Sequence, residues 1–112
     1  MELFRQLVPM ESHVEVKAMF GNLGAFVNGN MFAGLFGDSL GVKVLDEDAR
    51  ARLQALAGTG PYGPSDRPMG GYVALPADWP EHRDLAATWI GQALVDVRAL
   101  PPKKPKERQR RS

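Results

Sequence analysis

The dipeptide Asn28-Gly29 is the feature that most constrains how this chain can fold. It separates two short apolar runs, Ala-Phe-Val and Met-Phe-Ala, and both of its residues accept a positive φ angle at low cost. This arrangement predicts a β-hairpin with a two-residue turn, whose strands cover about 23–27 and 30–36. Gly21 and Gly24 offer similarly permissive residues one strand earlier, so we expect a second reversal between them.

Hydrophobic periodicity predicts the remaining elements. Alternating apolar residues indicate strands over 14–20 and 39–45, and Gly37-Asp38 marks the reversal before the second of these. Helical spacing predicts helices over 2–10, from an N-cap at Asp46 to Gly58, and over 81–100. A loop rich in Gly and Pro covers 58–71, with room for a short strand at Tyr62, and a further strand covers 71–75.

This order of elements predicts an α+β fold, a two-layer sandwich of an antiparallel sheet of about five strands with flanking helices. The 112 residues suffice for one domain, which we assign to 1–102. Residues 103–112 hold six of the 14 basic residues and one of the 13 acidic residues, so this tail carries +5 and the rest of the chain −4. Because the tail contains no apolar residue, we expect it to be disordered.

The central hairpin lacks the polar alternation expected of a sheet with one face in water. Regular alternation from the turn places Phe26, Met31, Ala33 and Leu35 on one face. It places Ala25, Val27, Phe32 and Phe36 on the other. Either helices cover both faces, or a second chain covers one of them. We expect a homodimer through the face that carries Ala25, Val27, Phe32 and Phe36.

No residue pattern indicates catalysis, a cofactor or a metal site. The chain has no cysteine, and His13 and His82 lie in polar segments without neighbouring ligands at metal-binding spacing. Gly21 and Gly24 are followed by a strand rather than the helix that a phosphate loop needs. We therefore expect a protein that is not an enzyme. The absence of a signal peptide pattern and of a long apolar run favours the cytoplasm.

Two other functional interpretations remain open. The loop around Tyr62, Arg67 and Trp79 could bind a small molecule, since Trp79 beside Pro80 is expected to be the more open tryptophan and Trp89 to pack in the core. The tail could bind nucleic acid, although no aromatic residues are interleaved with its charges. Its candidate contacts are Lys103, Lys104, Lys106, Arg108, Arg110 and Arg111.

The chain resembles the N-terminal domain of the TfoX/Sxy family, the bacterial competence-regulator group. The resemblance covers about residues 3–104, and a run ending in Met19-Phe20-Gly21 together with the Asn28-Gly29 hairpin carries most of it. Further matching segments are Leu40 to Val44, Arg67-Pro68-Met69, Gly71-Tyr72-Val73, Leu75-Pro76, the helix with Trp89 and Ala93, and Leu100 to Lys104.

The resemblance implies an antiparallel five-stranded sheet with helices, similar to type III secretion chaperones and often dimeric. Full-length competence regulators carry a second, helical domain that these residues do not include, and no catalytic residue of the family can be transferred to this chain. The expected function is therefore non-enzymatic contact with an unidentified protein partner, in transcriptional or competence-type regulation.

Overall fold

A computed structural model of the chain describes residues 2–19, 22–63 and 70–101. Six antiparallel strands form one sheet in the order β1-β2-β3-β4-β6-β5, and the helices precede, interrupt and follow them in sequence. The elements are α1 (Glu2–Leu7), β1 (Val14–Met19), β2 (Asn22–Val27), β3 (Asn30–Phe36), β4 (Ser39–Lys43), α2 (Glu47–Gln54), β5 (Gly60–Pro61), β6 (Tyr72–Ala74), the 3₁₀ turn η1 (Trp79–Glu81) and α3 (Arg83–Arg98). The predicted α+β fold is confirmed, with one more short strand than the expected five.

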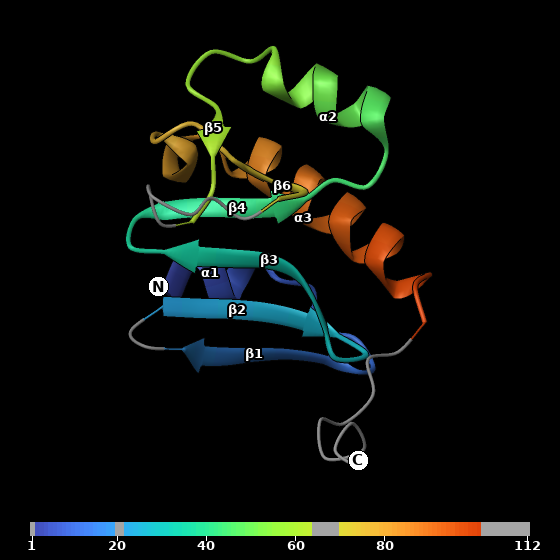
Figure 1. Ribbon diagram of the computed structural model, residues 1–112. Coiled ribbons are helices and arrows are strands. Elements are labelled where there is room, and N and C mark those ends of the chain that lie inside the picture. The colour runs from blue at the N-terminus through green and yellow to red at the C-terminus, as the bar shows by residue number, and fades with distance from the viewer. Residues whose placement is uncertain (1, 20–21, 64–69, 102–112) are drawn as a thin grey trace.

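Helices α1 and α3 lie on one side of the sheet. Figure 1 views the molecule from the opposite side, so that α1 and α3 stand behind β2, β3 and β4, while α2 lies beyond the β5 end. The residues with fully buried side chains come from both layers and form one core under α3: among the largest are Phe4, Phe32, Leu40, Leu53 and Ile90. No helix in the described ranges has the length and hydrophobicity needed to cross a membrane.

The predicted hairpin turn is present. Val27 pairs with Asn30, and the two residues between them have φ angles of 53° at Asn28 and 83° at Gly29. Both values lie in the left-handed region that this type of turn requires. The next reversal, also predicted, leaves Phe36 opposite Ser39, with a φ of 61° at Gly37.

The reversal expected between Gly21 and Gly24 does not extend as far as Gly24. Gly24 lies inside β2, where it is paired with Lys17 on one side and Gly34 on the other. The ladder between β1 and β2 continues to the pair Met19 and Asn22, so the chain turns before Asn22 rather than around it. Gly21 lies outside the described residues.

Both longer helices begin close to the predicted positions, but α2 ends at Gln54, earlier than the predicted Gly58. Asp46 caps α2 as expected, because its Oδ2 accepts a hydrogen bond of 2.8 Å from the backbone N–H of Ala49. In α3, Ile90, Ala93, Leu94 and Val97 recur at helical spacing and are buried against the sheet. The N-terminal helix is shorter than predicted and ends at Leu7.

Candidate functional site

A β-bulge in the central hairpin decides which side chains each face of the sheet presents. Phe26 pairs with Met31, but the next residue of β2, Ala25, pairs with Ala33 rather than with Phe32. The register therefore shifts by one residue, and Phe32 has no residue directly opposite it. From Ala33 onward, the faces of β3 are exchanged relative to an uninterrupted hairpin.

The predicted interface therefore needs correction. Ala25, Val27 and Phe32 are completely buried in the core beneath the helices, so they cannot contact a second chain. Ala33 and Leu35 join them there, whereas the prediction placed those two on the opposite face. Of the four residues proposed for contact, only Phe36 is exposed, at 39%.

The face of the sheet away from α1 and α3, which we call the open face, carries aromatic, apolar and charged side chains. Phe26 and Met31 are half-buried there, and Phe36 is exposed. The ammonium group of Lys17 lies 5.1 Å from the centroid of the Phe26 ring, and that of Lys43 lies 4.9 Å from the centroid of Tyr72. These distances allow cation–π attraction, so the two lysines hold their charges over an aromatic surface.

Tyr62 covers the centre of the open face. A Cβ atom on Gly34 would lie 2.5 Å from the Tyr62 hydroxyl oxygen, and one on Gly41 would lie under 3.0 Å from three atoms of the ring. Since Gly34 and Gly41 are directly paired across β3 and β4, the two glycines leave a flat area on which the ring rests. Tyr62 is only 4% exposed as a result.

The surroundings of Tyr62 are aromatic and affect its titration. Its ring lies 6.5 Å from Phe36 in an edge-on arrangement and 6.0 Å from Tyr72, measured between centroids. Burial, with a smaller contribution from Tyr72, raises the pKa of Tyr62 to about 12. Burial also raises the pKa of Tyr72, whose hydroxyl donates a 2.9 Å hydrogen bond to the carbonyl of Met31. Both phenols are therefore neutral at physiological pH.

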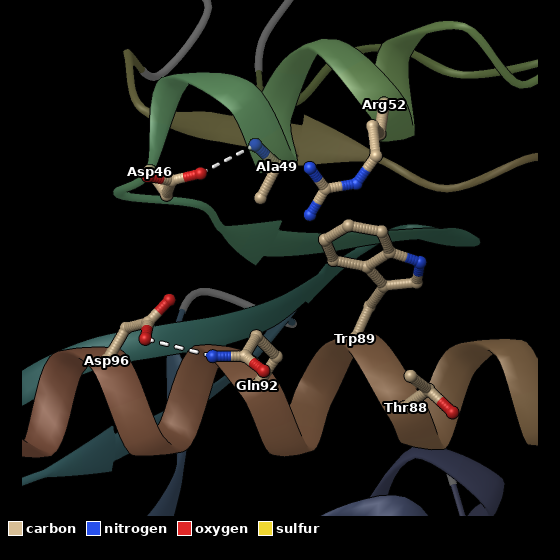
Figure 2. A pocket seen from close by; sticks show the side chains of 7 residues that line it. All are labelled: Asp46, Ala49, Arg52, Thr88, Trp89, Gln92 and Asp96. Carbon is tan, nitrogen blue, oxygen red and sulfur yellow. Dashed lines mark hydrogen bonds between the residues drawn. The ribbon is translucent and has the colours of Figure 1, made fainter.

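A second surface feature is a groove of about 390 Å³ between α2 and α3. Figure 2 shows Trp89 on α3 and Arg52 on α2 pointing toward one another across it, with Asp46 and Asp96 on opposite sides farther along. The Nε2 atom of Gln92 donates a 3.0 Å hydrogen bond to Asp96 Oδ1. The groove, which we call the α2–α3 groove, is lined by Asp46, Ala49, Arg52, Thr88, Trp89, Gln92 and Asp96.

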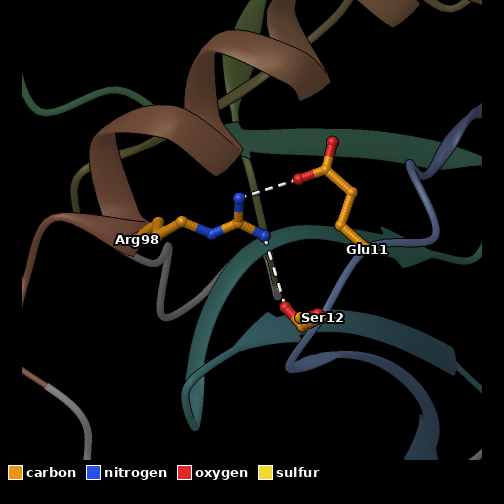
Figure 3. A network of polar contacts seen from close by, with 3 residues as sticks. All are labelled: Glu11, Ser12 and Arg98. Carbon is orange, nitrogen blue, oxygen red and sulfur yellow. Dashed lines mark hydrogen bonds and ion pairs between the residues drawn. The ribbon is translucent and has the colours of Figure 1, made fainter.

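The end of α3 is attached to the start of β1 and to the hairpin. Arg98 donates hydrogen bonds of 2.7 Å to the Glu11 carboxylate and 3.3 Å to the carbonyl of Ser12 (Figure 3). The side-chain amide of Asn30 donates a 3.0 Å hydrogen bond to the carbonyl of Pro101. These contacts fix the point from which the C-terminal tail leaves the domain.

The predicted small-molecule site is not assembled as expected. Trp79 is 5% exposed and belongs to the core, where its indole N–H donates a 3.0 Å hydrogen bond to the carbonyl of Asp38. Tyr62 lies on the open face instead, and Arg67 is outside the described residues. The expectation that Trp79 is the more open tryptophan is therefore wrong, whereas Trp89 packs against the core as expected, although it is only partly buried and also lines the α2–α3 groove.

The basic tail cannot be placed. Lys103, Lys104, Lys106, Arg108, Arg110 and Arg111 all lie outside the described residues. Within the described part of the chain, no three histidine, aspartate or glutamate side chains gather closely enough to hold a metal ion.

Sequence comparison connects this structure to a known family. A family model described as the TfoX N-terminal domain matches residues 2–96, which include every described helix and strand except the end of α3. No curated protein matches the chain.

Proposed function

Because the chain belongs to the TfoX N-terminal domain family, we propose that it is a competence-regulator-like domain that acts in the cytoplasm through contact with proteins and not as an enzyme. The observation that carries this proposal is the open face of the sheet. By the strand register it presents Phe26, Met31 and Phe36, of which Phe36 is exposed and the other two are half-buried. An apolar surface with charged neighbours is typical of a site for protein contact.

The partner we propose for the open face is a second copy of the same chain. Each Å² of apolar surface that a partner covers contributes ~25 cal/mol, before the cost of association is subtracted. This homodimer replaces the one expected from Ala25, Val27 and Phe32, whose side chains are in the core.

Light scattering coupled to size exclusion tests the proposal with the full chain. We expect a mass of twice 12.3 kDa at micromolar concentration. Phe36→Asp should convert this species to monomer, since a carboxylate would have to be buried in the contact. Val95→Asp is the matched control, because Val95 is an apolar residue of α3 that is 64% exposed on another surface.

A monomer for the unmodified chain at all concentrations would refute the homodimer. Equal effects of Phe36→Asp and Val95→Asp would show that the open face is not the contact. Retention of the chain on DNA that is lost on removal of residues 103–112 would favour nucleic-acid binding through the tail.

A further inference from the structure

The α2–α3 groove carries two carboxylates from different helices at one end. Each has already used one oxygen, since Asp46 Oδ2 accepts from the Ala49 N–H and Asp96 Oδ1 accepts from Gln92. The other oxygen of each carboxylate remains able to accept hydrogen bonds. No ion pair joins either group to another residue in the described ranges. This end of the groove therefore suits a cationic group.

The other end of the groove has a different chemistry. The partly buried indole of Trp89 lines the groove, and Arg52 points toward it from α2 (Figure 2). A segment that complements the groove therefore has positive charges near Asp46 and Asp96, followed by a negative charge near Arg52. Aromatic grooves of this kind also accept proline-rich segments, which lose little conformational freedom on binding.

The chain's own sequence after Pro101 has this order of charges. It reads Pro-Lys-Lys-Pro-Lys-Glu from 102 to 107, so that three lysines precede the tail's single acidic residue. A segment returning along α3 from its C-terminal end meets Asp96 first and Trp89 later. We propose that residues 102–107 dock in the α2–α3 groove of the same chain, with the lysines at Asp46 and Asp96 and Glu107 near Arg52.

The lengths agree with this placement. Pro101 is held by Asn30, and Asp96 and Trp89 are seven residues apart within α3. At 1.5 Å per helical residue, they are about 11 Å apart along the axis. An extended proline-rich segment advances about 3.1 Å per residue, so the six residues 102–107 are long enough to run from Asp96 to Trp89.

The indole N–H signals of the full-length, ¹⁵N-labelled protein provide the test. The chain has two tryptophans. The signal of Trp89 reports on the groove, and that of Trp79, whose N–H is bonded to Asp38 in the core, serves as the internal reference. We compare Lys104→Ser/Lys106→Ser with Arg110→Ser/Arg111→Ser, which removes the same amount of charge from a part of the tail beyond the proposed contact.

We expect the Trp89 signal to move in Lys104→Ser/Lys106→Ser and in Asp96→Asn, in the direction that added salt moves it in the unmodified protein. It should stay in place in Arg110→Ser/Arg111→Ser, and the Trp79 signal should not move in any variant. Equal movement in both tail variants would overturn the proposal in favour of diffuse attraction, and no movement in either would exclude docking. If the difference in the Trp89 signal between the two tail variants disappears on dilution, the tail contacts a second copy, and docking within one chain is wrong.

Discussion

Replacing Gly41 with Ala should destabilise the fold, because Tyr62 occupies the space that the new methyl group needs. The added Cβ would come under 3.0 Å from three ring atoms, closer than any tolerated contact. The backbone of β4 is held by pairing with both β3 and β6, so it cannot easily move away from the Tyr62 ring. Tyr62 must therefore move away from the sheet.

The size of the effect follows from two opposing terms. An aromatic side chain buries about 150–250 Å², and exposing roughly half of that costs ~2–3 kcal/mol at ~25 cal/mol per Å². A Gly→Ala change in a strand contributes about 0.5–1 kcal/mol in the stabilising direction, because it restricts the unfolded chain. The net expectation for Gly41→Ala is a loss of ~2 kcal/mol, which corresponds to a Tm lower by roughly 8 °C in a domain of this size.

Urea unfolding followed by circular dichroism measures this loss, and Gly60→Ala is the control. Gly60 also lies in the sheet, in β5, but a Cβ atom there would meet nothing within 4 Å. We expect Gly60→Ala to be neutral or slightly stabilising. The decisive comparison is a double-mutant cycle, in which Gly41→Ala should become nearly harmless in a Tyr62→Ala background. If Gly41→Ala costs as much there as in the unmodified protein, Tyr62 is not the cause and the reasoning fails.

Three further predictions concern the hairpin, the tail and the tyrosines. Gly29→Val should cost ~1–3 kcal/mol, because a β-branched residue tolerates the φ of 83° poorly; an unchanged Tm would place the turn elsewhere. Truncation after Pro102 should leave the melting curve nearly unchanged, since exposed ion pairs contribute little, and a large loss would mean that the tail is part of the folded core. Because the pKa of Tyr62 is raised from 10.0 to about 12 in the folded state, its contribution to stability is complete below pH 10 and is lost as the pH rises to about 12. A titration of tyrosinate absorbance in Tyr72→Phe measures the raised pKa of Tyr62 on which this expectation rests. Titration of Tyr62 near its ordinary pKa would contradict it.

The local part of the fold could be predicted from the sequence, but the assignment of its faces could not. Asn28-Gly29 specifies its turn by backbone conformation alone, so the hairpin was predictable. The bulge at Phe32 was not, because the residues on both sides of the slip are apolar and alternation gives no sign of it. Only the packing of α3 on the sheet decides that Ala33 and Leu35 face the core.

The candidate surfaces depend on contacts between residues far apart in the sequence. Trp79 is buried because its indole N–H reaches Asp38, 41 residues away, which no local pattern could indicate. The position of Tyr62 likewise depends on contacts with β3 and β4, which are separated from it in the sequence by α2. A signal existed in the pairing of Gly34 with Gly41, since adjacent glycines on neighbouring strands often mark the close approach of another group.

The two edges of the sheet differ in their capacity to recruit another strand. β5 has two residues, and Pro61 has no backbone N–H, so this edge has little to offer an incoming chain. β1 is six residues long and pairs only with β2 among the described strands. Association by edge pairing is therefore possible on one side only. Two copies joined through β1 would present two β5 edges outward, and each of these offers few backbone groups for a further strand.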